Sequence, residues 1–365
     1  MTKAKAMPDP WIIIATLAIL GIGVVMVYSA SAVLAFHDFG DSFYYLKRQA
    51  IFAVLGIVAM FFTMNVDYRV WRRWAFPGLL ICFGLLVIVL IPGVGVVRGG
   101  ARSWLGIGSL GIQPSEFMKM GMIVFLSKWL AEPVHPITGF TRGLLPPLAT
   151  IGAAFGLIML QPDLGTGAVL VGASLIIIYT AGARMAHLAG LGLLGVAGFV
   201  GLIAAAPYRL KRITAFLDPW QDPLGAGYQS IQSLYAIGPG GLVGLGLGMS
   251  RQKYSYLPEP QTDFIFSIIA EELGFIGGAT VLVLFLLLVW RGMRTAMTAP
   301  DTFGSLLAAG IVGMIAVQVV INIGVVIGMF PVTGITLPLV SAGGSSLTLM
   351  LTSIGVLLNI SRYAR

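Results

Sequence analysis

The stretch Leu257-Pro-Glu-Pro-Gln-Thr-Asp263-Phe-Ile-Phe266 marks the point where a long polar segment ends and an apolar helix is expected to begin. It places two carboxylates, Glu259 and Asp263, at the boundary between water and lipid. Desolvating a carboxylate there is costly, so an acid in such a place points to a function. We therefore expect any active site of this chain to be built around Asp263, with Glu259 in the loop at its rim.

The composition identifies the class of protein. The chain has 365 residues, of which 58% are hydrophobic and 10% charged, and its mean hydropathy is +0.95. Soluble domains carry roughly 25% charged residues, so this is a polytopic membrane protein. The one cysteine, Cys82, excludes an internal disulfide, and the three histidines are scattered, which argues against a zinc site.

Ten apolar stretches are long enough to cross a bilayer, which takes about 20 residues. They lie at roughly 11–35, 46–64, 75–95, 115–131, 144–160, 165–182, 186–206, 264–290, 304–329 and 337–360. The first is too long for the apolar core of a signal peptide, so we expect it to be retained. The sequence thus predicts an all-α polytopic membrane protein in which residues 1–365 form one domain, with ten transmembrane helices and a large outer loop at 207–263.

Basic residues in the short connections predict the orientation. Twelve of the 22 lysines and arginines fall on the side that carries both termini, nearly all in short loops or tails. We therefore expect both termini to be cytoplasmic. The net charge of +8 then follows from membrane topology, and no nucleic acid partner is needed to explain it.

Polar motifs gather at the starts of the helices that are expected to run from outside to inside. These motifs are Lys47-Arg48-Gln49, Gln113-Pro-Ser-Glu116, Gln161-Pro-Asp163-Leu-Gly-Thr-Gly167, Pro258-Glu-Pro-Gln-Thr-Asp263 and Ser341-Ala-Gly-Gly-Ser-Ser346. Because alternate helix ends share one side of the membrane, the topology predicts a single polar site at the outer face.

Two interpretations are open for each charged group of this site. Asp263 either complements the dipole of the following helix or acts as a general base. Glu116 and Lys119 share a helix face and form either a structural ion pair or a cavity wall on which Lys119 binds a phosphate. Asp163 either caps its helix or belongs to the site.

The outer loops and the adjacent acids Glu271 and Glu272 add further candidates. Val97-Arg-Gly-Gly-Ala-Arg-Ser-Trp104 is either an interfacial anchor or an arginine site for an anionic headgroup. The glycine-rich run 238–248 lacks the Lys-Ser/Thr of a P-loop, so a re-entrant segment is favoured over a nucleotide site. One of the two adjacent acids is expected to pair with an intramembrane base such as Lys119.

Together these motifs resemble those of the SEDS family (shape, elongation, division and sporulation) of peptidoglycan polymerases, which includes RodA and FtsW. The resemblance extends from about residue 12 to 365, and within the family it is strongest to the FtsW/SpoVE branch. Its motifs are Gly100-Ala-Arg-Ser-Trp104, Gln113-Pro-Ser-Glu116-Phe-Met-Lys119, Gln161-Pro-Asp163-Leu-Gly-Thr166, Gly227-Tyr-Gln229, Leu257–Phe266, Ala270-Glu-Glu-Leu-Gly274, Pro331-Val-Thr-Gly-Ile-Thr-Leu-Pro338 and Ile360-Ser-Arg-Tyr363. One departure is Ala342, where the family usually has tyrosine.

The resemblance implies a glycosyltransferase of the bacterial cytoplasmic membrane. It would polymerise lipid II into glycan strands at the outer face, in cell division, cell shape or spore cortex synthesis. It implies that Asp263 is catalytic. The implied substrate-binding residues are Arg48, Arg102, Trp104, Glu116, Lys119, Asp163, Ser341 and Ser345.

The resemblance also implies a set of partners. They are lipid II, the growing glycan strand, a class B penicillin-binding protein and membrane lipids, without nucleic acid. No metal ligand is assigned, and a divalent cation such as Mg²⁺ is the one cofactor considered, as an aid to the diphosphate leaving group.

Two other functions fit part of the sequence. Intramembrane acids in a ten-span protein also suit a transporter or a lipid II flippase, and a scaffold for a transpeptidase would not need Asp263. The gathering of polar residues at the outer face, with few at the membrane midplane, favours the enzyme.

Overall fold

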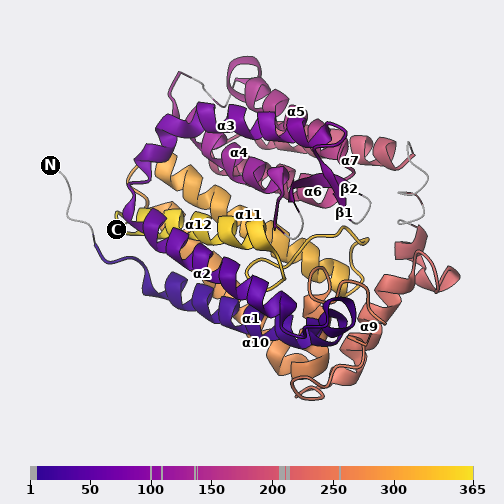
Figure 1. The fold of residues 1–365 in the computed structure, drawn as a ribbon. Helices are drawn as coiled ribbons and strands as arrows, with labels where there is room; N and C mark the ends of the chain where they lie inside the picture. The colour runs from indigo at the N-terminus through magenta and orange to yellow at the C-terminus, as the bar shows by residue number, and fades with distance from the viewer. Residues whose placement is uncertain are drawn as a thin grey trace.

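The computed structural model describes residues 6–98, 101–107, 110–134, 137, 139–204, 210, 214–254 and 256–364. Its main elements are long helices (Figure 1). They are α1 (Pro10–Phe39), α2 (Tyr44–Asn65), α3 (Arg69–Leu90), α4 (Pro114–Ala131), η1 (Phe140–Leu144), α5 (Leu145–Met159), α6 (Leu164–Thr180), α7 (Met185–Ala204), η2 (Pro219–Gln221), α9 (Tyr228–Gly240), α10 (Ile265–Thr298), α11 (Thr302–Val326) and α12 (Gly344–Ser361).

Each of the ten apolar stretches predicted from the sequence overlaps one of these helices. Among the described residues, seven helical segments are long and apolar enough to cross a membrane, namely Pro10–Phe39, Tyr44–Asn65, Arg69–Leu90, Phe140–Met159, Ile265–Thr298, Thr302–Val326 and Gly344–Ser361. The helix α4 is not among them and carries three charged residues, Glu116, Lys119 and Lys128. The chain is thus a mostly helical, multi-pass membrane protein, and the count of ten crossings stays a prediction.

The largest differences from the predicted helix boundaries occur at three helix ends. The helix α3 begins at Arg69 instead of 75, because its first turns carry the basic residues that the hydropathy pattern assigns to a loop. The helix α10 continues to Thr298, beyond 290. The helix α12 begins only at Gly344, because the residues before it form a turn, in which the Ser341 amide donates to the Leu337 carbonyl at 3.0 Å, followed by an irregular segment bonded to its neighbours.

The prediction of an all-α fold is wrong in one region. Three short strands, β1 (Val96–Arg98), β2 (Ala101–Ile107) and β3 (Leu110–Ile112), form an antiparallel sheet between α3 and α4. In its register Val97 lies opposite Arg102, and Leu105 lies opposite Ile112. Valine, isoleucine and tryptophan favour a pleated surface, which explains a sheet in a loop that hydropathy alone leaves without structure.

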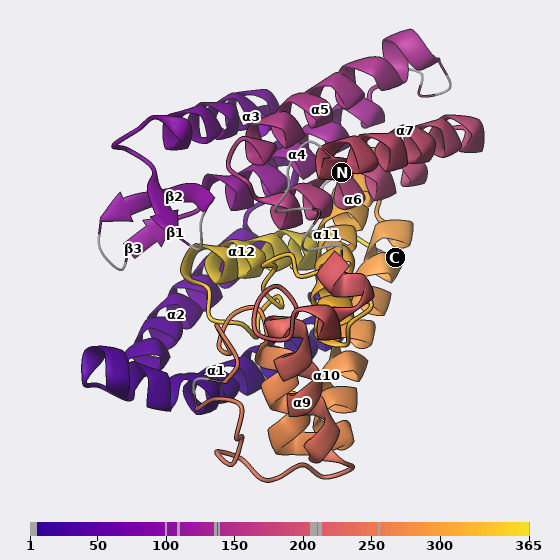
Figure 2. The same ribbon diagram turned by 90° about the vertical axis from the view of Figure 1, so that its right-hand side faces the viewer.

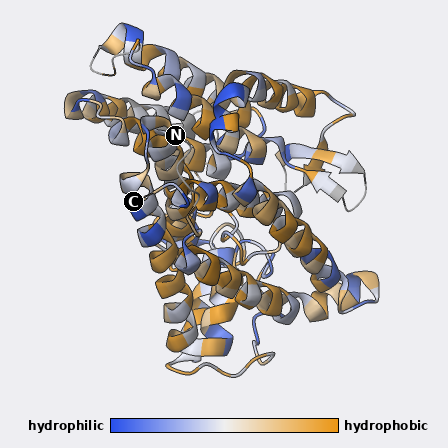
Figure 3. Ribbon diagram, turned by 90° about the vertical axis from the view of Figure 1, so that its left-hand side faces the viewer, coloured by the Kyte–Doolittle hydropathy of each residue, from blue (hydrophilic) through white to orange (hydrophobic). Residues whose placement is uncertain are grey.

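The helices α11 and α12 lie in the middle of the molecule. Figures 1 and 2 show α1, α2, α9 and α10 on one side of them and α3 to α7 on the other. The backbones of α2 and α12 approach so closely that a Cβ on Gly355 would lie 2.3 Å from the Met60 carbonyl oxygen. Small residues permit such contacts between membrane helices. In Figure 3 the helices consist mainly of hydrophobic residues, with hydrophilic residues mainly toward their ends.

The first and last described residues of the chain lie together at one end of the bundle. The Asp9 amide donates to Ser361 Oγ at 3.0 Å, and the Ala6 amide donates to the Arg362 carbonyl at 3.1 Å. Arg291, near the end of α10, is paired with Asp9 (2.5 Å, Nη2 to Oδ2). The two termini are therefore on the same face of the bundle, opposite the starts of α10 and α12.

Candidate active site

Asp263 lies in a turn directly before α10. The helix begins at Ile265 with Phe264 in the N-cap position, so Asp263 stands one residue outside the cap. The Asn322 side-chain amide, from α11, donates to the Asp263 backbone carbonyl at 2.9 Å and to the Ile335 carbonyl at 2.6 Å. The Ser341 hydroxyl donates to the Thr262 carbonyl at 2.6 Å. The backbone of Asp263 is thus held from two sides.

The carboxylate of Asp263 faces the segment that connects α11 to α12. A Cβ built on Gly334 would lie 3.6 Å from Asp263 Oδ2, and Gly334 has a φ of +74°. A glycine adopts this conformation without the steric cost that other residues bear. The Asp263 side chain is half-buried, so it combines a fixed backbone with access from outside the protein.

Glu116 and Lys119 form a buried ion pair on α4. Their side chains approach to 2.8 Å, and the two residues are 8% and 3% exposed. The Lys119 ammonium also donates to Gln318 Oε1 at 3.1 Å, and the Ser346 hydroxyl donates to Glu116 Oε2 at 3.0 Å. The structure therefore favours the ion-pair interpretation over a lysine that is free to bind phosphate.

Gln318 extends this pair toward Asp263. Its side-chain NH₂ donates to the Thr336 carbonyl at 3.0 Å, next to Ile335, whose carbonyl accepts from Asn322. Gln318 thus joins α11 to the neighbouring helix α4, whereas Asn322 bonds to carbonyls of the connecting segments. A continuous series of polar contacts therefore links Glu116 on α4 with the turn that holds Asp263.

Asp163 caps α6 and also joins this network. Its Oδ1 accepts from the Thr166 amide at 3.0 Å, and its Oδ2 accepts from the Gln113 side chain at 3.0 Å. The Gln113 amide in turn donates to Ser345 Oγ at 3.4 Å. Burial raises the pKa of Asp163, in the turn between α5 and α6, above its ordinary value. Asp163 therefore both caps α6 and belongs to the polar network of the site.

Gln49 connects α2 to the same region. Its side chain donates to the Ser341 carbonyl at 3.2 Å and accepts from the Gly343 amide at 3.3 Å. The Ala342 amide donates to the Gln261 carbonyl at 2.8 Å. Position 342 therefore contributes through its backbone, and this contact does not need the tyrosine that the family usually has there.

The remaining predicted site residues lie on neighbouring elements. Arg48 is half-buried on α2, and Arg102 and Trp104 lie on β2. The stem of Arg102 passes over Gly95, where an added Cβ would lie 2.8 Å from Arg102 Cγ. The hydrogen bonds described above join Glu116, Lys119, Asp163, Ser341 and Ser345 to the Asp263 turn, but they include neither Arg48 nor Arg102. Gln49 and Gln113 lie in the polar motifs found in the sequence, but they were not among the predicted substrate-binding residues.

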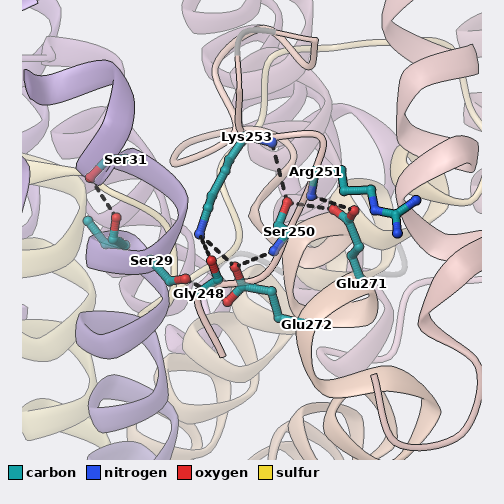
Figure 4. A network of polar contacts seen from close by, with 9 residues as sticks. Ser29, Ser31, Gly248, Ser250, Arg251, Lys253, Glu271 and Glu272 are labelled. Carbon is teal, nitrogen blue, oxygen red and sulfur yellow. Dashed lines mark hydrogen bonds and ion pairs between the residues drawn. The ribbon is translucent and has the colours of Figure 1, made fainter. Parts of the chain in front are cut away.

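A second polar network holds residues 248–253 against α10 (Figure 4). Glu272 accepts from the Ser29 hydroxyl of α1 at 2.6 Å and from the Lys253 ammonium at 3.2 Å. Glu271 accepts from the Ser250 hydroxyl at 2.5 Å and from the Arg251 amide at 2.8 Å. The expectation that Lys119 pairs with one of these acids is wrong. The partner is Lys253, which lies in the loop before α10 and is buried against Glu272.

The glycine-rich run after α9 is built into α10. At Gly274 the helix is interrupted (φ 66°, ψ −163°). There the Leu245 amide donates to the Glu271 carbonyl at 3.0 Å, and the Phe275 amide donates to the Gly241 carbonyl at 2.9 Å. These bonds replace those that the interruption removes from the helix. The loop is therefore ordered at this point and braces the helix that follows Asp263.

Among the described residues, no three His, Cys, Asp or Glu side chains gather in a way that could hold a metal ion.

Comparison with known proteins shows a relationship over nearly the whole chain. The profile of the FtsW/RodA/SpoVE family, described as cell cycle proteins, matches residues 10–365. Stage V sporulation protein E of Bacillus subtilis is 62% identical over 365 residues and covers 100% of both chains. A probable peptidoglycan glycosyltransferase FtsW of Trichlorobacter lovleyi is 46% identical, over 97% of this chain and 93% of the relative.

Solved structures agree with this result. A chain from a peptidoglycan synthase complex, studied for the coordination of polymerization and crosslinking, superposes with a TM-score of 0.80 at 33% identity, covering 97% of this chain and 98% of that one. The rod shape determining protein RodA of Thermus thermophilus superposes with a TM-score of 0.72 at 31% identity, covering 97% of each chain.

Proposed function

The chain belongs to the FtsW/RodA/SpoVE family of cell cycle proteins, and we infer that it is a peptidoglycan glycosyltransferase that polymerises lipid II. The observation that carries this inference is the setting of Asp263. Its carboxylate is half-buried on a turn whose backbone is held by Asn322 and Ser341. Fixed geometry beside an accessible carboxylate is what general-base catalysis on a bound hydroxyl needs.

In the proposed reaction Asp263 acts as the general base. Its carboxylate takes the proton of a sugar hydroxyl on the acceptor, and the hydroxyl oxygen forms a bond to the anomeric carbon of the donor. The bond from that carbon to the lipid pyrophosphate breaks, and the pyrophosphate leaves with the electron pair. Each cycle adds one disaccharide to the strand and releases one lipid diphosphate.

The leaving diphosphate needs positive charge. Lys119 is already bound to Glu116 and Gln318, so we assign it a positioning role. Arg48 on α2 and Arg102 on β2 are the proposed diphosphate ligands because both are partly accessible on the side of Asp263. Trp104, on the same strand as Arg102, is proposed as an apolar contact to the substrate.

The proposed membrane arrangement follows from the same reasoning. Ten helices cross the bacterial cytoplasmic membrane, both termini are cytoplasmic, and the Asp263 turn opens to the outer face. The similar chain in a peptidoglycan synthase complex supports a class B penicillin-binding protein as the partner, which would crosslink the glycan that this chain makes.

The test is polymerisation by the purified full chain, reconstituted with labelled lipid II with and without a class B penicillin-binding protein. We expect wild-type protein to give long glycan on a gel. Asp263→Asn keeps the shape and removes the base, so its rate should fall by about 10²- to 10⁴-fold. Glu259→Gln is the matched control, because it neutralises a carboxylate of the same loop and should retain activity.

Three outcomes would contradict the proposal. Wild-type polymer yield from Asp263→Asn would remove the assigned base. Labelled lipid II that changes leaflet without polymer formation would support a flippase. Polymer that depends on the partner alone, whatever residue 263 is, would make the chain a scaffold.

A further inference from the structure

A cavity lies between α3 and α4, at the end of the bundle that carries the termini. It has a volume of about 190 Å³ and is lined by Phe76, Phe125, Lys128, Trp129 and Glu132. Glu116 and Lys128 are twelve residues apart on α4, which at 1.5 Å per residue places them roughly 18 Å apart along the helix axis. The cavity is therefore distinct from the Asp263 site.

The charges around the cavity leave an excess of positive charge. Lys128, half-buried in the wall, forms no ion pair with any described residue. The neighbouring acid, Glu132, lies 3.8 Å from the Arg72 guanidinium (Oε1 to Nη2). Arg73 and Arg142 are exposed at the same end. Arg142 is held near the cavity because the Trp129 indole donates to the carbonyl of the next residue, Gly143, at 3.3 Å.

The apolar part of the cavity continues toward the membrane. Phe76 is 54% exposed, and Leu80, one turn further along the same face of α3, is also 54% exposed. Trp74 is 59% exposed near the start of α3, and tryptophans are common where helices cross the membrane–water interface. A cationic cavity thus opens onto an apolar stripe in a helix that is long and apolar enough to span the bilayer.

We propose that this cavity binds an anionic phospholipid, with the headgroup phosphate on Lys128 and an acyl chain along Phe76 and Leu80. Basic cavities between membrane helices on the side of the positive loops recognise anionic headgroups in this way. The volume is below the roughly 300–1,000 Å³ of sites for whole drug-sized ligands. It suits a headgroup whose chains stay in the bilayer. The charge complementarity selects an anionic lipid over a zwitterionic one.

The test is lipid binding by the full chain in detergent, followed by native mass spectrometry. Phosphatidylglycerol is titrated against phosphatidylcholine with the same acyl chains, and glycerol phosphate tests the headgroup alone. Lys128→Gln removes the charge and keeps a polar side chain. A charge near an anionic headgroup contributes about 1 kcal/mol, so phosphatidylglycerol affinity should fall about fivefold. Lys128→Arg should retain the affinity, and it serves as the second variant if Lys128→Gln does not fold.

The matched control is Arg294→Gln, an exposed basic residue near the end of α10 on the face of the termini. It should leave phosphatidylglycerol affinity unchanged. Equal affinities of Lys128→Gln and Arg294→Gln would overturn the proposal. So would binding of phosphatidylcholine as tight as that of phosphatidylglycerol, which would indicate an apolar contact only. Competition by glycerol phosphate at the same concentration as the lipid would show a soluble phosphate ligand instead and also overturn it.

Discussion

The ion pair between Glu116 and Lys119 is the most direct test of how the polar network supports the active site. Lys119→Met keeps the apolar stem and removes the ammonium. It leaves the Glu116 carboxylate, 8% exposed, with the Ser346 hydroxyl as its hydrogen-bond donor in the cluster, and it takes a donor from Gln318. Breaking a buried pair from one side costs about 3–5 kcal/mol because a charge is stranded.

The double substitution separates charge from packing. In E116Q/K119M no charge is stranded, and the amide that replaces the carboxylate still accepts from Ser346. We expect this variant to lose about 1–2 kcal/mol, of the order of one or two ordinary hydrogen bonds. The coupling energy is the loss of stability in the double variant minus the summed losses of the two single variants, and we expect its magnitude to be at least about 1 kcal/mol, within the range found for residues in contact.

The assay is the free energy of unfolding in mixed micelles, measured for the wild type, both single variants and the double variant. Polymerisation of lipid II is measured on the same preparations. We expect the double variant to recover stability over Lys119→Met and to retain part of its activity, since Lys119 positions the segment near Asp263. Additive losses, with the double variant as unstable as the sum of the singles, would refute the reasoning. Complete loss of activity in a stable double variant would show that Lys119 acts on substrate.

Three further predictions concern the surrounding structure. Gly274→Ala should destabilise the protein by more than the roughly 1–3 kcal/mol of backbone strain at φ +66°, because its Cβ would lie 2.3 Å from the Gly244 nitrogen. Gly84→Ala on α3, which meets nothing within 4 Å, should stay within about 0.5 kcal/mol of wild type in the same unfolding assay. Glu272→Gln removes the charge opposite Lys253, so hydrogen exchange at residues 248–253 should quicken, and unchanged protection would contradict this role. Burial raises the pKa of Asp163, so the folded state binds its proton more tightly than the unfolded state does. The free energy of unfolding, relative to that of Asp163→Asn, should therefore be greatest at low pH and fall as the pH rises above 3.8. A relative free energy of unfolding that increases with pH would contradict this assignment.

The sequence alone predicted the class of protein, because the free energy of a membrane span depends on the composition of one continuous segment. The mean hydropathy of +0.95 and the long apolar runs are properties of the sequence that do not depend on which residues come into contact in the fold. The alternation of spans then predicted that polar motifs from five helices share one face. The structure does connect four of these motifs, from Gln49 to Ser341, to the turn of Asp263. The role of Asp263 as a base stays a prediction.

Only the tertiary structure decided which polar groups meet. Asn322 reaches the Asp263 carbonyl across 59 positions of sequence, and Gln49 reaches Ser341 across 292. Lys253 pairs with Glu272, although the sequence favoured Lys119 for that place. Hydropathy is read along a single segment, whereas a hydrogen bond depends on the positions of two atoms that packing brings together. The sequence therefore determined that this chain is a membrane protein with polar helix ends, and the packing of α2, α4, α11 and α12 determined how those ends form one site.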